Sequence, residues 1–193
     1  MTTRDMGPIT RCVGKLVPPP QPFQFPLPPP AADLCDFEQV KAEIQSLLST
    51  SSPLLPADVF DGQAYYGGLL VRLAWRCADT FRSTDFLGGC NGARLRFAPE
   101  KKWPANAALD AALSLLQPIK EKFGAGLSWG DLIILAGSTA LEVAGNISIK
   151  FCPGRSDALD GSASETLTPQ PLDFGSARAW KESIKRLGLS ARE

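Results

Sequence analysis

Apolar side chains recur at helical spacing in several stretches of the chain. The first stretch follows Asp36, a residue that can cap a helix. Its apolar positions fall on one helical face: Val40, Ile44, Leu47 and Leu48. Further helices are predicted at about residues 65–82, 107–123, 128–145 and 177–187. No stretch shows the sustained alternation of a strand, so the pattern predicts an all-α domain with long loops.

Capping and helix-breaking residues mark the ends of these segments. Ser128 and Asp131 have the spacing of a capping box at the start of the fourth helix. Gly124 ends the third helix, because glycine readily takes the left-handed conformation that terminates helices. Residues 51–63 contain prolines and a glycine and are predicted to form a loop, as is the glycine-rich segment 88–92.

The first 35 residues differ in character from the rest. Residues 17–30 read VPPPQPFQFPLPPP, and this much proline forbids helix interiors and favours extended polyproline II geometry. Such a strip suits docking along an apolar groove of its own domain or of a partner, and its composition also fits a flexible linker. We therefore divide the chain into an extended Pro-rich arm over residues 1–35 and a helical domain over residues 36–193.

Charge and hydropathy exclude several classes of protein. Twenty basic and twenty acidic residues give a formal net charge of zero, so nothing in the composition points to nucleic acid or an anionic membrane surface. No apolar run approaches the roughly 18 residues of a membrane span, and the N-terminus lacks the apolar core of a signal peptide. We expect no transmembrane segment and, at most, a peripheral place in a membrane complex.

Two residue types limit the chemistry. The chain contains no histidine, which is the commonest general acid or base near neutral pH and the commonest neutral metal ligand. Its five cysteines are scattered, form no C-x-x-C pair and are odd in number. The simplest interpretation is buried or free thiols in a reducing compartment. No metal site is predicted.

The second helix carries a polar stripe on an otherwise apolar surface. Its polar residues recur at helical spacing: Arg72, Arg76, Asp79, Thr80 and Ser83. Trp75 borders the stripe. Two arginines one turn apart repel each other unless an anion, a carboxylate or a carbonyl group satisfies them. From spacing alone, the favoured interpretation is a pair of surface arginines that face solvent or a partner.

This helix resembles the distal helix of class I haem peroxidases, the group that contains ascorbate peroxidase and catalase-peroxidase. The resembling segment is GGLLVRLAWRCADTFR, residues 67–82. Similarity continues through GGCNGARLRFAPE (88–100), WPANAALDAALSLLQPIKEKF (103–123), LSWGDLIILAGSTALEVAG (127–145) and FCPGRSD (151–157). WKESIKRLGLSARE (180–193) is similar to the segment before the family's proximal helix. The resemblance implies a peroxidase-like distal helical lobe, truncated, over residues 40–193.

Family roles carry over to four positions. Arg72 matches the distal arginine that helps to polarise peroxide, and Trp75 matches the aromatic residue beside the haem. Asn106 matches the asparagine that hydrogen-bonds the distal histidine, and Arg76 stands at the histidine position itself. Peroxide cleavage requires a group that takes up a proton and returns it, whereas arginine keeps its proton. We expect these positions to be remnants without a catalytic residue, with Asn106 bonded to the backbone.

The resemblance also implies that a haem ligand is lacking. The chain stops at Glu193, where the family's proximal helix would begin, so the proximal histidine and its aspartate are expected to be absent. No cysteine lies in a recognisable haem-thiolate context; those considered are Cys77, Cys90 and Cys152. We therefore expect no cofactor. Arg155 is expected to pair with Asp157 or Asp160, and Glu142 is expected to be structural.

Two functional hypotheses follow. The first is a non-catalytic, peroxidase-derived structural or accessory subunit of a larger complex. Other protein subunits would contact it through the Pro-rich arm and the exposed apolar faces of the helices. By analogy with the family alone, we expect an organelle, with a thylakoid-associated plastid setting favoured over a mitochondrion. The alternative is the distal half of a split haem peroxidase, completed by another chain or by a C-terminal extension. A remaining option is small-molecule binding in a remnant pocket beside the second helix.

Overall fold

The computed structural model describes residues 26–53, 55–82, 87–167, 177–178 and 181. Within them, four α-helices provide most of the regular structure: α1 (Phe37–Leu48), α2 (Gly67–Ala78), α3 (Leu109–Phe123) and α4 (Trp129–Gly145). The strands β1 (Asp58–Phe60) and β2 (Gln63–Tyr65) form the one sheet among these residues. The predicted all-helical lobe is confirmed, with a small hairpin added.

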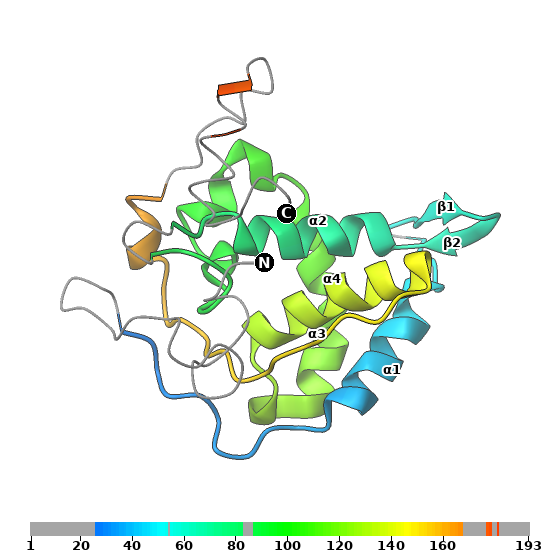
Figure 1. Cartoon of the computed structure of the whole chain (residues 1–193), viewed down its shortest axis with the longest axis horizontal. Helices are drawn as coiled ribbons and strands as arrows, with labels where there is room; N and C mark the ends of the chain where they lie inside the picture. The colour runs from blue at the N-terminus through cyan, green and yellow to red at the C-terminus, as the bar shows by residue number, and fades with distance from the viewer. Residues whose placement is uncertain (1–25, 54, 83–86, 168–176, 179–180, 182–193) are drawn as a thin grey trace.

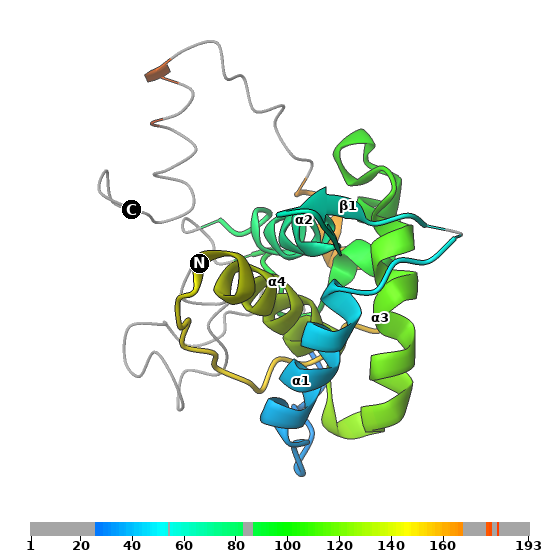
Figure 2. The same cartoon turned by 90° about the vertical axis from the view of Figure 1, so that its right-hand side faces the viewer.

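The central helix of the lobe is α4. It lies between α1 and α2 in both views (Figure 1, Figure 2), and residues 130–140 are all buried. A helix that is covered on every side needs small or apolar residues around its whole circumference. Gly137 allows α2 to approach closely, because a β-carbon at this position would lie 2.4 Å from Ala74 Cβ. The buried face of α2 is therefore fixed against α4.

The helix caps agree with the sequence in most respects. Asp36 Oδ1 accepts hydrogen bonds from Glu38 N at 3.0 Å and Gln39 N at 3.3 Å, so the predicted cap of α1 is confirmed. At α4, Ser128 Oγ accepts a hydrogen bond from Asp131 N at 3.0 Å. The reciprocal half of the predicted capping box is wrong, because the Asp131 carboxylate is buried and binds other donors.

The prediction of an unbroken loop over residues 51–63 is wrong. β1 and β2 pair in antiparallel fashion, with Val59 opposite Ala64, and Figure 1 shows the hairpin projecting beyond the helices. The two residues of its turn, Asp61 and Gly62, have φ angles of 50° and 76°. This left-handed pair matches the twist of two antiparallel strands, and Asp-Gly is among the sequences that favour it.

Helix boundaries differ from the prediction by a few residues. α2 ends at Ala78 rather than near Arg82, because the chain turns back there: Arg82 N donates to Leu87 O at 2.9 Å, and Gly89 N donates to Thr80 Oγ1 at 3.0 Å. α3 ends where Gly124 takes a φ of 58°, as predicted. Most of the helix expected at 177–187, and most of the Pro-rich arm, lie outside the described residues.

An ion pair ties α1 to α4. Lys41 Nζ lies 2.6 Å from Glu142 Oε2, and Ile149 N donates to Glu142 Oε1 at 2.7 Å. Burial opposes ionisation of Glu142, but the Ile149 amide and the Lys41 ammonium group hold its pKa below the usual value. These contacts are consistent with the structural role expected for Glu142.

The expectation of free thiols is wrong for three cysteines. Cys77 on α2 is bonded to Cys90 in the glycine-rich loop, and Cys152 is also disulfide-bonded. Cys35 is the one free cysteine among the described residues, and it is half-buried. The Cys77–Cys90 bond is possible because the chain returns to the end of α2 within 13 residues. Disulfides of this kind are typical of an oxidising compartment.

Removing the Cys77–Cys90 disulfide is expected to lower the free energy of unfolding. The bond closes a loop of 13 residues, for which the chain-entropy estimate is about 2–3 kcal/mol. The double variant Cys77→Ala/Cys90→Ala should show this loss in urea unfolding monitored by circular dichroism. Cys35→Ala is the matched control, since it removes a free thiol. Equal midpoints for the double variant and the control would contradict a stabilising role for the disulfide.

Among the described residues, no helix is both long enough and apolar enough to span a membrane.

Candidate functional site

The family-matched positions on α2 differ in exposure. Arg72 is exposed and Trp75 is 48 % exposed, whereas Arg76 is only 8 % exposed. Asn106, at the end of the 3-10 turn η5 (Pro104–Asn106), is 4 % exposed. The structure thus brings Asn106 to the buried side of the stripe, beside Arg76.

Arg76 is held by two polar partners. Its Nε donates to Asn106 Oδ1 at 2.8 Å, and its Nη1 forms an ion pair with Asp79 Oδ2. Its Nη2 is buried and has no hydrogen-bond partner among the described residues. The interpretation of two surface arginines is therefore wrong for Arg76. Asp79, one turn further along α2, supplies the carboxylate that a buried guanidinium group needs.

Asn106 connects Arg76 to the neighbouring turn. Its Nδ2 donates to the backbone oxygen of Glu100 at 2.8 Å, so the expected bond to the backbone is confirmed. The bond from Arg76 to its amide oxygen was not anticipated. Arginine Nε–H is a donor, as an imidazole N–H is. The residue at the histidine position therefore gives Asn106 the kind of hydrogen bond that the resemblance assigns to histidine.

Arg72 binds the same turn from the exposed side. Its Nη2 donates to Ala105 O at 3.0 Å and to Ala107 O at 2.9 Å, on either side of Asn106. Two arginines one turn apart are tolerated because backbone carbonyls accept from Arg72, while Asn106 and Asp79 bind Nε and Nη1 of Arg76. Arg72 and Arg76 together hold the turn at residues 104–107 against α2.

A buried acid lies next to this cluster. Glu100, in the 3-10 turn η4 (Glu100–Lys102), is 3 % exposed, and its Oε1 accepts a hydrogen bond from Ser164 Oγ. Burial raises the pKa of Glu100, while Ser164 and the guanidinium groups of Arg94 and Arg76 oppose the rise. No local sequence pattern predicts this contact, because Glu100 and Ser164 are 64 residues apart.

Arg76 cannot act as the proton-transferring base of a peroxide-cleaving site. A general base must exchange its proton near neutral pH, and a guanidinium group does not. Arg76 is also committed to Asn106 and Asp79, so its position is occupied by a fixed positive charge. Within this cluster, Arg76 acts as a structural cross-link between α2 and the η5 turn.

The described residues offer no axial ligand suited to haem iron. The exposed indole of Trp75 and the guanidinium group of Arg72 are suitable neighbours for a planar group. However, the sequence contains no histidine, and the described residues include no cluster of acidic or sulfur ligands that could hold a metal. Among the cysteines considered as ligands, every one is disulfide-bonded: Cys77, Cys90 and Cys152. Burial raises the pKa of Cys35, which disfavours its thiolate.

The expected partners of Arg155 are also wrong. Its Nη1 lies 2.9 Å from Asp131 Oδ1, and the two side chains are 1 % and 0 % exposed. Asp157 instead accepts hydrogen bonds from Trp129 N at 3.0 Å and Gly130 N at 3.3 Å, at the first turn of α4. A carboxylate is stabilised there by the unpaired amides and by the helix dipole.

Asp131 receives donors from the backbone as well. Gly154 N donates to Oδ2 at 2.6 Å, and Arg155 N lies 3.2 Å from both oxygens. Burial raises the pKa of Asp131, and the Arg155 guanidinium group with these two amides opposes the rise. The segment 151–157 is therefore fastened to α4 by a fully buried ion pair.

Comparison with known proteins agrees with the resemblance seen in the sequence. The family described as peroxidase matches residues 40–193. Catalase-peroxidase 1 of Burkholderia ambifaria (strain MC40-6) is 43 % identical over 147 residues, which is 76 % of this chain and 18 % of that protein. The catalase-peroxidase of Burkholderia mallei (strain SAVP1) is 41 % identical over 152 residues, which is 79 % of this chain and 19 % of that protein. The chain spans less than a fifth of the length of these relatives.

Proposed function

This chain belongs to the peroxidase family, and from that premise we propose that it is a non-catalytic member that serves as a structural or accessory subunit of a larger protein complex. The observation that carries the proposal is the state of Arg76. A buried guanidinium group, bonded to Asn106 and Asp79, stands where the family resemblance places the proton-transferring histidine. The contribution of Arg76 in this proposal is structural, through its contacts with Asn106 and Asp79.

Exposed apolar side chains support the proposal of a protein partner. Trp75 on α2 is 48 % exposed, and the C-terminal end of α4 exposes Leu141 and Val143 by 46 % and 49 %. Ile147, just beyond α4, is 56 % exposed. Large apolar side chains that gather at a helix end are typical of surfaces that bind protein. The Pro-rich arm is the second contact that we propose for such a partner.

The proposed setting is an organelle, with a plastid favoured over a mitochondrion and a thylakoid-associated complex as the assembly. This placement rests on analogy with the family. The Cys77–Cys90 disulfide favours an oxidising compartment within that setting. Fractionation of organelles from the source cells, with an antibody against the chain, tests it. Recovery of the protein in a reducing, soluble fraction would argue against the proposed setting.

A second function is favoured by a different observation. Arg72 and Trp75 remain exposed on one side of α2, and the relatives are named catalase-peroxidases. The chain also spans less than a fifth of those relatives. If another polypeptide segment supplies an iron ligand, this lobe would form one wall of a haem pocket. In that case Arg72 and Trp75 would face the haem.

One measurement separates the two functions. The chain is purified with its native partners, and its visible spectrum is recorded before and after addition of haem. The subunit function predicts no Soret band in proportion to the chain and no peroxide-dependent oxidation of guaiacol. It also predicts that the chain migrates with other proteins in a larger complex. A stoichiometric Soret band with guaiacol turnover would instead establish the split peroxidase, and a catalase-peroxidase measured in parallel is the positive control.

A further inference from the structure

The sequence contains one Asn-x-Ser/Thr motif, formed by Asn146, Ile147 and Ser148. This is the acceptor motif for N-linked glycosylation when the middle residue is not proline. The other two asparagines lack a hydroxyl residue two positions later, since Gly-Ala follows Asn91 and Ala-Ala follows Asn106. A match of three residues also arises by chance, so the place of the motif in the fold decides whether it is usable.

The motif lies at the surface, where α4 ends. Asn146 directly follows the last residue of the helix, and Figure 1 shows the chain turning back at this end. All three residues of the motif are exposed, and residues 147–150 have no regular secondary structure. An exposed loop can carry a bulky, hydrophilic glycan while the domain stays folded. The structural context that the motif requires is therefore present.

The backbone at Asn146 terminates α4. Its φ and ψ angles are 47° and 45°, and its N–H donates to Glu142 O. Asparagine is one of the few residues besides glycine that readily adopt this left-handed conformation, so a role as helix cap also accounts for it. The cap makes no use of Ser148. The hydroxyl group of Ser148 is therefore the part of the motif that separates glycosylation from capping.

The disulfides of the chain are a second, independent observation. Cys77 is bonded to Cys90, and Cys152 is also disulfide-bonded. Proteins that enter the secretory pathway form disulfides in the oxidising lumen of the endoplasmic reticulum. N-linked glycans are attached in the same lumen. The disulfides and the exposed acceptor motif thus favour the same route for this chain.

We propose that Asn146 is an N-glycosylation site whose co-substrate is an oligosaccharide linked to a lipid diphosphate. In the transfer, the amide nitrogen of Asn146 forms a bond to the anomeric carbon of the first sugar. The bond between that carbon and the diphosphate oxygen breaks, and the lipid diphosphate leaves with the electron pair. One amide proton is lost to the transferase. The site does not rest on the function proposed for Arg76.

A glycan at Asn146 would cover exposed apolar side chains beside it. Val143, three residues earlier, is 49 % exposed, and Ile147, the next residue, is 56 % exposed. A bulky hydrophilic group at this point hinders a protein that approaches the end of α4. If the chain is the subunit proposed above, its partner would contact the glycosylated form through Trp75 and the Pro-rich arm instead.

Peptide mapping of the protein purified from the source cells tests the proposal. The protein is digested with peptide-N-glycosidase in heavy-oxygen water, which releases the glycan and converts a glycosylated Asn146 to an aspartate that carries the heavy oxygen. We expect this label at position 146, together with an increase in electrophoretic mobility. The label distinguishes enzymatic release from earlier spontaneous deamidation. An unmodified Asn146 in the native protein would overturn the proposal.

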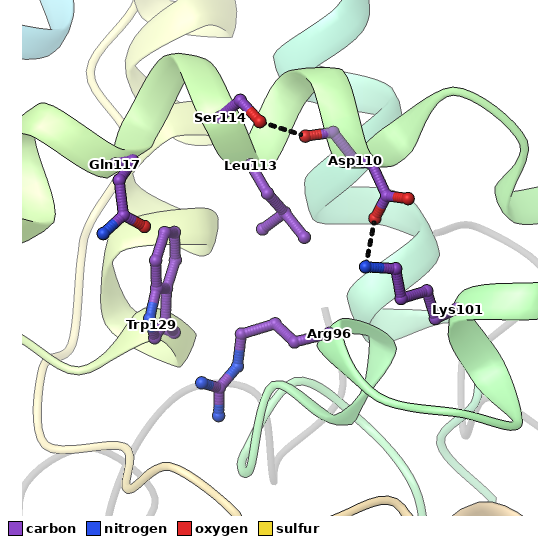
Figure 3. A pocket seen from close by; sticks show the side chains of 7 residues that line it. All are labelled: Arg96, Lys101, Asp110, Leu113, Ser114, Gln117 and Trp129. Atoms are coloured by element: carbon purple, nitrogen blue, oxygen red, sulfur yellow. Dashed lines mark hydrogen bonds and ion pairs between the residues drawn. The ribbon is translucent and has the colours of Figure 1, made fainter.

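Three serine variants assign the glycan to the motif. Ser148→Ala removes the hydroxyl group and should abolish the mobility shift, whereas Ser148→Thr keeps a hydroxyl group and should retain the shift. Ser114→Ala is the control at an exposed serine on α3, whose Oγ donates to Asp110 O at 2.9 Å (Figure 3). It should also retain the shift. A shift that persists in Ser148→Ala would place the glycan elsewhere and refute the site.

The glycan and the setting proposed above are tested by different measurements. Fractionation shows where the chain resides, whereas a glycan shows that the chain has passed through the endoplasmic reticulum. A glycosylated chain outside the plastid keeps the site and overturns the setting. A plastid chain with an unmodified Asn146 keeps the setting and overturns the site.

Discussion

Replacing Asp131 by alanine is expected to lower the free energy of unfolding by about 3–5 kcal/mol, the range for breaking a buried ion pair. Asp131 and Arg155 are 0 % and 1 % exposed, and the carboxylate also accepts from Gly154 N and Arg155 N. Without it, a buried guanidinium group loses its carboxylate partner and two amides lose an acceptor. Urea unfolding followed by circular dichroism measures the loss.

Two further variants show whether the loss comes from the unpaired charge. Asp110→Ala removes a carboxylate that is 62 % exposed and pairs with Lys101 at 3.2 Å, and it should change stability by less than about 1 kcal/mol. Asp131→Leu/Arg155→Met replaces both charges by apolar groups and should recover part of the loss. If the double variant is no more stable than Asp131→Ala, the uncompensated charge is not the cause.

The helices were predictable because their signals are local. Asp36 caps α1, and the apolar periodicity of Val40 and Ile44 identifies its buried face. Gly124 ends α3 by taking a positive φ angle of 58°. Each of these features depends on residues within one or two turns, so the sequence contains all the information that is needed. The Asp61–Gly62 turn was equally local, and an Asp-Gly pair is the signal that would have identified the hairpin.

The site was predictable only in part. The sequence placed Arg72, Arg76 and Asn106 at positions shared with the family, and the structure brings these residues together. The partner of Arg76 on its own helix, Asp79, lies three residues away, and that spacing was a usable signal. What the resemblance did not contain is how an arginine is accommodated at the position of a histidine.

Contacts between residues far apart in the sequence could not be predicted from local sequence patterns. Arg155 has acidic residues two and five positions away, yet it pairs with Asp131, 24 residues earlier. The nearer Asp157 is drawn to the amides at the start of α4, where a carboxylate satisfies unpaired donors. The Cys77–Cys90 disulfide likewise depends on the return of the glycine-rich loop to α2. Tertiary packing decided each of these pairings.

Because Arg76 links α2 to the η5 turn, its replacement is expected to have the second large effect on stability. Arg76→Met is expected to lower the free energy of unfolding by about 3–4 kcal/mol, because it breaks the buried ion pair with Asp79 and removes the Arg76 Nε donor from Asn106 Oδ1. Arg72→Met is the matched control on the same helix. It removes hydrogen bonds from an exposed side chain to Ala105 O and Ala107 O, which should lower stability by about 1 kcal/mol.

The Arg76→His variant tests whether Arg76 stabilises the fold or is only accommodated at this position. An imidazole N–H can donate to Asn106 Oδ1, as Arg76 Nε does at 2.8 Å, but the shorter side chain does not replace the ion pair with Asp79. We therefore expect stability between that of Arg76→Met and that of the unaltered chain, measured by urea unfolding. If Arg76→His equals or exceeds the unaltered chain, the Asp79 ion pair contributes nothing. The histidine position would then have lost its base without gaining a structural function, and the support that Arg76 gives to the subunit proposal would be lost.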